Sequence, residues 1–295
     1  MRHDWVTESG NPASTEIDSL STLEIVRLIN SEDAKIAAAV ALEESNIAAA
    51  VALITEKLRD GGRLIYIGAG TSGRLGVLDA SECPPTFNSD PRQVVGLIAG
   101  GSGALTRAIE GAEDDLSAAP RDLTAIDFSA SDCLVGIATS GRTPYVIGGV
   151  CWARELGAKT IGLACNQDSE LAKHVDVMIT PIVGPEVISG STRMKAGTAT
   201  KLVLNILTTG AMVQLGKTYG NRMVDLRASN SKLIIRARRL VAFLSNVSEE
   251  AAEAILSQCS GEVKTAIVMQ RLGVDATTAR QQLSDANGHL RKVIG

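Results

Sequence analysis

The chain has 295 residues, of which 45% are hydrophobic and only 3% aromatic, and it has a net charge of −4. This composition provides neither the basic surface nor the stacking rings of a nucleic-acid-binding protein. The five cysteines lack CxxC spacing and the three histidines lie far apart, so the sequence predicts reduced thiols, no metal site and no cofactor.

The sequence carries no sign of export or of membrane insertion. Its first five residues, Met1 to Trp5, contain no apolar signal core, and no apolar run reaches membrane-spanning length. We therefore expect a cytoplasmic protein with no membrane partner.

Residues 19–60 have helical periodicity and predict two helices, the second of which begins at Ser31-Glu32-Asp33. From residue 61 onward, short apolar runs alternate with helical patterns. The predicted strands are 64–67, 94–99, 133–138, 160–164 and 177–180, and the predicted helices between them are 74–82, 103–118 and 144–157. Such alternation predicts an α/β fold with a doubly wound parallel sheet of five strands, which binds ligands at the carboxyl ends of its strands.

The strand pattern ends after residue 190. Residues 192–216 predict a long helix, and residues 246–293 predict a small module of three helices that begin near Ser248, Gly261 and Asp275. The chain therefore divides into three expected parts, an N-terminal helical segment, a central α/β domain and a small C-terminal helical module: 1–60, 61–245 and 246–295.

The first predicted strand leads into a glycine-rich turn, Gly68-Ala69-Gly70-Thr71-Ser72-Gly73, at the start of a helix. Glycines allow a bound group to approach the backbone, and amide and hydroxyl donors at a helix N-terminus bind anions, most often phosphate. The turn also fits the G-x-G-x-x-G pattern of dinucleotide sites, which requires an acid at the end of the next strand. That strand is followed by Gly100-Gly101-Ser102, so a phosphomonoester fits better than a dinucleotide or a turn that serves packing alone.

Two further turns are rich in hydroxyl residues. Thr139-Ser140-Gly141-Arg142-Thr143 follows the third predicted strand, and Ser189-Gly190-Ser191-Thr192-Arg193 precedes the long helix. A single turn of this kind is usually a helix cap, but several at one edge of a sheet point to a shared pocket. Hydroxyls and helix N-termini without a Walker lysine favour a sugar phosphate over a nucleoside triphosphate.

Two acidic positions are candidates for proton transfer. Glu82 lies at the expected C-terminal end of the helix that the glycine turn begins, where the helix dipole disfavours an acid, and Pro84-Pro85 follows it. Glu113 lies in the acidic run 110–115, and the residues alone do not select it over its neighbours. For both glutamates, a solvated carboxylate is the simpler interpretation from the residues alone.

These stretches resemble a known family. Residues 184–201, which begin Gly184-Pro185-Glu186, are similar to the signature shared by N-acetylmuramic acid 6-phosphate etherases and the glucokinase regulatory protein. Residues 68–87 are similar to the etherase pattern nearly residue for residue, as are Asn11-Pro12, residues 20–24 and residues 110–115. The resemblance extends over essentially the whole chain.

The resemblance implies a sugar isomerase (SIS) fold, a homodimer, and cleavage of the D-lactyl ether of N-acetylmuramic acid 6-phosphate in peptidoglycan recycling. The implied products are N-acetylglucosamine 6-phosphate and D-lactate. It also implies Glu82 as the acid that protonates the departing lactate oxygen and Glu113 as the base at C2. The residues expected to hold the phosphate are Thr71, Ser72, Thr139, Ser140 and Thr143, with Ser189 and Ser191 close by.

Two other functions fit the same residues. An aldose–ketose sugar-phosphate isomerase on the same fold would also need a base at C2. A non-catalytic sugar-phosphate sensor that regulates a kinase would share the 184–201 signature, but the regulatory protein of that kind carries two such domains, and this chain has predicted strands for only one.

Overall fold

The computed structural model describes residues 5–226 and 231–295. The first four residues, which belong to the stretch used to argue against a signal sequence, lie outside the described residues. The chain forms two compact units: a large unit of Met1–Ser81 and Arg92–Thr208, and a small unit of Glu82–Pro91 and Thr209–Gly295. The three-part domain division expected from the sequence stays a prediction.

Residues 19–60 contain three α-helices rather than the two predicted, and three short 3-10 helices precede them. These elements are η1 Val6–Glu8, η2 Pro12–Ser14, η3 Ile17–Ser19, α1 Thr22–Asp33, α2 Ile36–Ala41 and α3 Glu44–Arg59. A capping box fixes the start of α1, because the Glu24 carboxylate accepts a hydrogen bond from the Ser21 amide at 2.8 Å. Ser31-Glu32-Asp33 ends α1 instead of beginning the second helix, since Glu32 in its last turn is buried against Lys195.

The five predicted strands are confirmed and form one parallel sheet in the order β2-β1-β3-β4-β5. Their bounds are β1 Leu64–Gly68, β2 Val94–Ile98, β3 Cys133–Ile137, β4 Lys159–Leu163 and β5 Val177–Ile179. All residues of β1 and β3 are buried, as expected for central strands covered on both faces. The strand order reverses between β1 and β3, where open α/β sheets bind their ligands.

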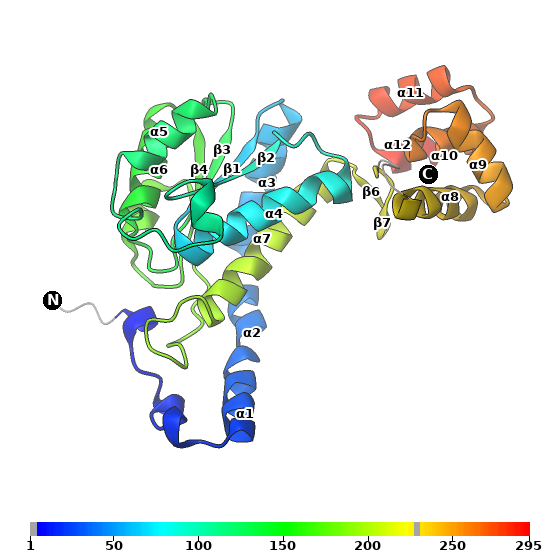
Figure 1. The fold of residues 1–295 in the computed structure, drawn as a ribbon. Helices are drawn as coiled ribbons and strands as arrows, with labels where there is room; N and C mark the ends of the chain where they lie inside the picture. Colours follow the sequence, from blue (N-terminus) through cyan, green and yellow to red (C-terminus); the bar gives the residue numbers. More distant parts are fainter. Residues whose placement is uncertain (1–4, 227–230) are drawn as a thin grey trace. The chain divides into compact units, whose positions relative to one another are not determined.

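Helices cover both faces of the sheet, which confirms the doubly wound arrangement. Helices α5 (Ala118–Ala125) and α6 (Pro144–Glu155) cover one face (Figure 1). There Ile65 and Ile67 of β1 pack in a core cluster with Leu123 of α5 and Val146 of α6. On the opposite face, the Tyr66 hydroxyl donates a hydrogen bond to Asp79 of α4 (Gly70–Phe87) at 2.9 Å.

Two predicted helices have different bounds. The helix expected over 103–118 is wrong: only η4 (Ser102–Leu105) is helical there, and α5 begins at Ala118. Gly111, with φ +72°, breaks the run, and the two aspartates that follow, Asp114 and Asp115, have low helix propensity. The helix expected over 74–82 extends from Gly70 to Phe87 because Pro84 and Pro85 have a helical φ, so Glu82 does not lie at its C-terminal end.

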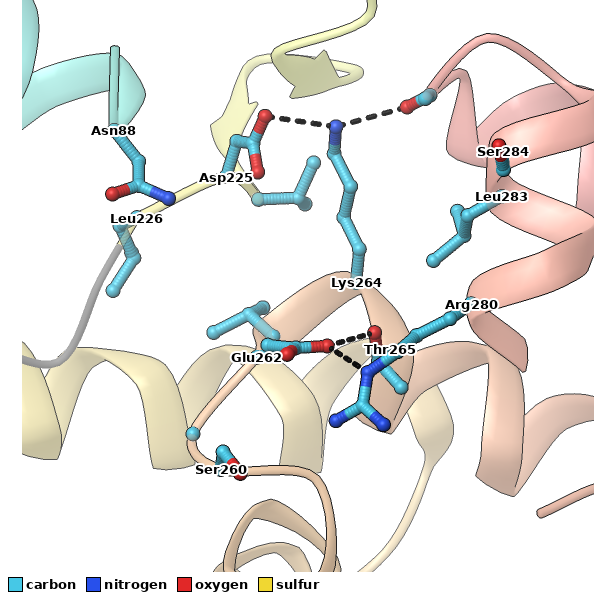
Figure 2. A pocket seen from close by; sticks show the side chains of 14 residues that line it. Asn88, Asp225, Leu226, Ser260, Glu262, Lys264, Thr265, Arg280, Leu283 and Ser284 are labelled. Carbon is cyan, nitrogen blue, oxygen red and sulfur yellow. Dashed lines mark hydrogen bonds and ion pairs between the residues drawn. The ribbon is translucent and has the colours of Figure 1, made fainter. Parts of the chain in front are cut away.

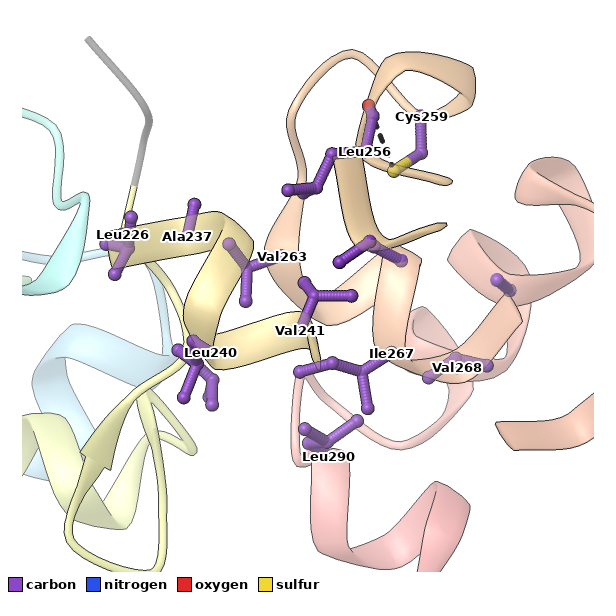
Figure 3. Packing of buried hydrophobic residues seen from close by; sticks show 14 of the residues in the cluster. Leu226, Ala237, Leu240, Val241, Leu256, Cys259, Val263, Ile267, Val268 and Leu290 are labelled. Atoms are coloured by element: carbon purple, nitrogen blue, oxygen red, sulfur yellow. Dashed lines mark hydrogen bonds between the residues drawn. The ribbon is translucent and has the colours of Figure 1, made fainter. Parts of the chain in front are cut away.

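The small unit has its own apolar core, formed by side chains such as Val241, Leu256, Val263, Ile267 and Leu290 (Figure 3). A short helix, η5 (Glu170–His174), lies between β4 and β5. The elements that follow β5 are α7 Lys195–Gln214, β6 Thr218–Tyr219, β7 Arg222–Met223, α8 Ser231–Ser245, α9 Glu249–Gln258, α10 Val263–Leu272, α11 Ala276–Asp285 and α12 Leu290–Ile294. The predicted three-helix module corresponds to α9, α10 and α11, and the short helix α12 follows it. As predicted, Ser248 and Asp275 cap α9 and α11.

Among the described residues, no single helix is long and apolar enough to cross a membrane. One bent pair, Thr22–Ala41 with Glu44–Arg59 at 61°, meets the criteria of length and composition only when its two parts are taken together.

Candidate active site

A polar cavity of about 550 Å³ lies at the carboxyl ends of β1 and β3, where the strand order reverses. The described residues that line it are Glu8, Ala69, Gly70, Thr71, Ser72, Glu113, Asp114, Thr139, Ser140, Arg142, Thr143, Pro144 and Thr192. The first two hydroxyl-rich turns therefore contribute to the same cavity. Thr71, Ser72, Thr139, Ser140, Thr143 and Glu113, all singled out from the sequence, lie together there.

The glycine turn brings the start of α4 against the end of β1. A Cβ on Gly73 would lie 2.5 Å from the carbonyl oxygen of Gly68, so this approach requires glycine. Gly70 has φ +54°, a conformation that glycine adopts without strain, and α4 begins there. Thr71 and Ser72 thus lie in the first turn of α4, whose amides have no acceptors within the helix and favour a bound anion.

The second turn ends at the start of α6. Thr143 is the N-cap residue, but its side chain makes no capping hydrogen bond, and it lines the cavity. The Asn166 amide donates to the carbonyl oxygens of Thr139 at 3.2 Å and Ser140 at 3.4 Å, which holds the turn in place. A second helix N-terminus therefore contributes to the cavity.

The third hydroxyl-rich turn contributes a residue that the sequence did not single out. Thr192 is among the described residues that line the cavity, whereas Ser189 and Ser191 are not. The exposed Ser189 hydroxyl instead donates to the carbonyl oxygen of Glu8 at 2.9 Å. The phosphate role predicted for Ser189 and Ser191 stays a prediction without support from this cavity.

Buried ionic groups hold the chain around this third turn. The Glu186 carboxylate accepts hydrogen bonds from the amides of Lys195 and Ala196, both at 2.9 Å, at the start of α7. The Lys195 ammonium, 1% exposed, lies 2.7 Å from the carboxylate of Glu32. Hydrogen bonds from Lys195 and Lys35 lower the pKa of Glu32 to about 2. The turn is therefore fixed at both ends by interactions that burial strengthens.

The acidic run 110–115 divides into residues inside and outside the cavity. Glu113 and Asp114 line it, and the Glu113 carbonyl oxygen accepts a hydrogen bond from the amide of Tyr145 at 2.9 Å. Asp115 instead pairs with Arg121, which lowers the pKa of Asp115 to about 2. The sequence did not select one catalytic acid within the run 110–115. In the structure, only Glu113 and Asp114 of this run line the cavity.

Glu82 is not one of this group of residues. It is exposed on the part of α4 that belongs to the small unit, and it is not among the described residues that line the cavity. Its predicted catalytic role stays a prediction.

A partly buried acid lies on the same helix. Asp79 accepts hydrogen bonds from the hydroxyls of Tyr66 at 2.9 Å and Thr208 at 3.2 Å. Burial raises the pKa of Asp79 to about 6, and the two hydroxyls only partly offset this. Asp79 was not selected from the sequence, and no sequence pattern marks it.

Arg142 and Glu8 are cavity residues that sequence reasoning missed. The Arg142 guanidinium lies 4.0 Å from the Glu8 carboxylate and 4.8 Å from the centre of the Trp5 ring. A cation inside a hydroxyl-rich turn was a signal that could have identified Arg142. Glu8 reaches the cavity only through long-range packing, which local sequence patterns do not contain.

This arrangement suits a small anionic ligand that undergoes proton transfer. Two helix N-termini and Arg142 provide positive potential, and the hydroxyl groups provide donors for phosphate oxygens. The carboxylates of Glu113 and Asp114 can accept or donate a proton.

The small unit contains a second cavity, of about 600 Å³ (Figure 2). Its charged side chains are paired with one another. Lys264 donates to Asp225 at 3.0 Å and to the Gly288 carbonyl oxygen at 2.9 Å, while Glu262 accepts from Thr265 at 2.7 Å and Arg280 at 2.9 Å. These groups are therefore engaged in structural contacts.

Comparison with known proteins gives matches over nearly the whole chain. An N-acetylmuramic acid 6-phosphate etherase from Rhodopirellula baltica is 62% identical over 98% of this chain and 95% of the relative. The chain belongs to the family of N-acetylmuramic acid 6-phosphate etherases. Other etherases in this family, from Yersinia pestis and Photorhabdus laumondii, are 55% and 52% identical; they cover 98% and 99% of this chain, over 98% and 97% of their own lengths.

Domain families and solved structures agree with the etherase fold. The N-terminal SIS domain of glucokinase regulatory protein matches residues 46–153, the SIS domain matches 117–210, and the C-terminal lid domain of glucokinase regulatory protein matches 220–266. A phosphoheptose isomerase from Neisseria gonorrhoeae is 20% identical, with a TM-score of 0.50 over 65% of this chain and 98% of that one. This similarity shows the SIS fold alone.

Proposed function

We propose that the protein cleaves the D-lactyl ether of N-acetylmuramic acid 6-phosphate in peptidoglycan recycling, which belongs to amino sugar metabolism. The enzyme is then a carbon–oxygen lyase with N-acetylglucosamine 6-phosphate and D-lactate as products. Membership of the etherase family over nearly the whole chain is the observation that carries the proposal. The cavity supports it, since phosphate donors and a carboxylate line the same space.

The phosphate group anchors the substrate at the two helix N-termini. The proposed contacts come from the hydroxyls of Thr71, Ser72, Thr139, Ser140 and Thr143. Binding the phosphate on C6 at a fixed point orients C1 to C3 relative to the catalytic carboxylates. The substrate therefore loses translational and rotational freedom when it binds, and less remains to be lost in the chemical step.

The reaction is an elimination followed by addition of water. Direct hydrolysis of the ether is slow because an alkoxide is a poor leaving group, but opening of the sugar ring exposes an aldehyde at C1 that acidifies the C2 proton. A carboxylate removes this proton, the C3–O bond breaks, and lactate leaves with a proton from a carboxylic acid. Water then adds at C3 of the conjugated aldehyde and a proton returns to C2, so that one water is consumed overall.

We assign the base at C2 to Glu113 and the acid that protonates the departing lactate oxygen to Glu82. The position of Glu113 in the cavity supports its part of the assignment, whereas that of Glu82 rests on the resemblance to the family pattern. Each proton transfer is expected to contribute about 10²–10⁴-fold to the rate.

The two steps can be tested separately in deuterated water. Wild type should release D-lactate, while Glu82→Gln and Glu113→Gln should both lose this activity by about 10²-fold or more. The Glu82→Gln variant should still exchange the C2 proton for deuterium, because its base is intact, whereas Glu113→Gln should not. Glu56→Gln, at an exposed position on α3, is a matched control and should match wild type.

Each outcome has a consequence. A wild-type protein that releases no D-lactate would contradict the etherase proposal, and interconversion of aldose and ketose phosphates would favour the isomerase. Full activity of Glu82→Gln would exclude Glu82 as the acid.

We also propose that the enzyme is a cytoplasmic homodimer. The family resemblance supports the dimer, and phosphorylated sugars are retained in the cytoplasm because ionised phosphates do not cross membranes unaided. Analytical ultracentrifugation should give twice the mass of one chain, and cell fractionation should recover the activity with cytoplasmic proteins.

A further inference from the structure

Arg142 is the one cation among the described residues that line the active-site cavity. It follows Ser140 and Gly141 in the turn after β3 and precedes the N-cap residue of α6. The phosphate contacts proposed above do not involve its guanidinium, so its presence in the cavity requires a separate explanation.

The guanidinium of Arg142 makes no hydrogen bond with the described residues. Its one ionic neighbour, the carboxylate of Glu8, lies at 4.0 Å, and both side chains are about half exposed, at 50% and 52%. Arg63 offers the opposite case, because its guanidinium donates to both oxygens of Asp132 and to the carbonyl oxygens of Ile126 and Asp127. The donors of Arg63 are engaged in the fold, whereas those of Arg142 are available to a ligand.

The position of Arg142 is nevertheless well defined. Its guanidinium stacks on the ring of Trp5, and the segment that carries Trp5 is tied down by Thr7, whose amide and hydroxyl contact Asn166 at 3.2 and 2.9 Å. The backbone next to Arg142 is also anchored, since the Gly141 carbonyl oxygen accepts from the Leu171 amide at 2.9 Å. A cation that is held in place with unused donors is suited to bidentate binding of a carboxylate.

The proposed substrate carries two anionic groups, a phosphate on C6 and the carboxylate of the lactyl group on C3. We propose that Arg142 binds the lactyl carboxylate and so distinguishes the ether substrate from sugar phosphates that lack a carboxylate. This inference rests on the proposed function and adds a residue that determines specificity. Phosphate at the helix N-termini and carboxylate at Arg142 then hold the substrate at two points, with the reacting carbons between them.

The surroundings of Arg142 provide space and a competitor for this carboxylate. Arg142 also lines an adjoining cavity of about 380 Å³, together with Trp5 and Asn166. Glu8 is the acid nearest to the Arg142 guanidinium. When the substrate carboxylate binds to Arg142, it displaces the Glu8 carboxylate from this contact. Removing the charge of Glu8 should therefore favour the ether substrate.

The experiment compares a ligand that has the carboxylate with one that lacks it. For Arg142→Ala and Arg142→Lys, we measure kcat/KM for D-lactate release and, by calorimetry, the Kd of N-acetylglucosamine 6-phosphate. We expect kcat/KM to fall by about 10–100-fold in Arg142→Ala, because a charge-assisted contact is lost. The Kd of N-acetylglucosamine 6-phosphate should change by less than about two-fold, which also reports that the variant is folded. In Arg142→Lys, kcat/KM for D-lactate release should fall by a smaller factor than in Arg142→Ala.

Controls and contrary outcomes complete the test. Lys159→Ala removes an exposed cation at the start of β4 that lines neither cavity and should leave both quantities unchanged, while Glu8→Gln should lower KM for the ether substrate. An equal weakening of both ligands in Arg142→Ala would assign Arg142 to the phosphate, and an unchanged kcat/KM would exclude any role in binding; either result overturns the inference. Failure of the wild type to release D-lactate is a separate result that contradicts the proposed function itself.

Discussion

The active-site cavity of the large unit and the cavity of the small unit are similar in volume, about 550 Å³ and about 600 Å³, but they differ in how their charged side chains are used. In the small unit, Lys264 and Glu262 are both engaged by neighbouring side chains. In the large unit, the guanidinium of Arg142 makes no hydrogen bond with the described residues, and the Thr143 side chain makes no capping hydrogen bond.

This difference in the use of charged side chains distinguishes the active-site cavity, which has donors available to a ligand, from the cavity of the small unit, whose charged groups stabilise the fold. Donors that already have partners stabilise the fold and have little left for a ligand, because a new contact must replace an existing one. Donors held in place without partners lose only water when a ligand arrives. The state of the polar groups, rather than the volume of the cavity, therefore identifies the site.

The largest expected effect comes from removing hydroxyl donors of the first cavity. Ser72→Ala combined with Thr143→Ala should raise KM for the ether substrate by about 100-fold or more, because each hydrogen bond to an ionised phosphate contributes about 1.5–3 kcal/mol. The fold should be unaffected, since the Thr143 side chain makes no capping bond. Steady-state kinetics of D-lactate release measure this, with Ser260→Ala in the second cavity as the control. An unchanged KM would mean that the phosphate binds elsewhere.

A second contrast concerns the buried lysines of the two units. Lys195→Met should lower the free energy of unfolding of the large unit by about 3–5 kcal/mol, because it leaves the buried carboxylate of Glu32 without its closest buried cation. Lys264→Met should lower the free energy of unfolding of the small unit by less, because Asp225 is still paired with Lys217, whose ammonium lies 2.8 Å from its carboxylate. Calorimetry of both variants measures the difference, and equal losses would contradict it.

The two units also differ in how they hold a partly buried aspartate, which makes a pH dependence testable. Lys217 and Lys264 hold Asp225, whereas hydroxyl groups of Tyr66 and Thr208 are the hydrogen-bond donors to Asp79, whose pKa is raised to about 6. The folded state therefore binds a proton that the unfolded chain has released, and this stabilisation is full below about pH 4 and is lost as the pH rises through 6.

Asp79→Asn removes this titration. Relative to the variant, wild type should lose about 2 kcal/mol of unfolding free energy between pH 4 and pH 7.5. Urea unfolding at several pH values measures the change. Parallel pH profiles for wild type and variant would show that Asp79 ionises as it does in the unfolded chain.

The smallest effect is expected at the second cavity. Arg280→Ala removes a guanidinium whose Nε donates to Glu262 at 2.9 Å on a half-exposed surface. KM for the ether substrate should change by less than about two-fold, because Arg280 does not line the active-site cavity and the loss of a surface ion pair leaves the fold nearly as stable. A large increase in KM would show that the second cavity also takes part in substrate binding, and the contrast between the two cavities would fail.

Local patterns were sufficient for most of the fold. The five strands were predicted within a residue or two because they are short apolar runs bounded by turns, and the caps of α9 and α11 were predicted because Ser248 and Asp275 accept hydrogen bonds close by in the sequence. The helix predicted over 103–118 shows where such patterns fail. In 103–118, weak helical periodicity was outweighed by Gly111 and by packing of the following chain against α6, which the sequence does not display.

The candidate site was predictable to the extent that it follows strand ends. The turns after β1 and β3 lie in one cavity because both strands end at the same edge of the sheet. Glu8 and Trp5 could not be found in this way, since they meet Arg142 from more than a hundred residues away in the chain. For Glu113, only the placement of the acidic run against α6 separates it from Asp115.

The contacts of the N-terminal segment also set an order for biosynthesis. The hydrogen-bond partner of Thr7, Asn166, is synthesised 159 residues after it, and the carbonyl oxygen of Thr7 accepts from the amide of Gly190, which follows later still. Contacts of such long sequence separation form late because a long loop must first close. The wall of the cavity that carries Trp5 and Glu8 can therefore be completed only after residue 190 has been translated, and the nascent protein cannot recognise its ligand fully before then.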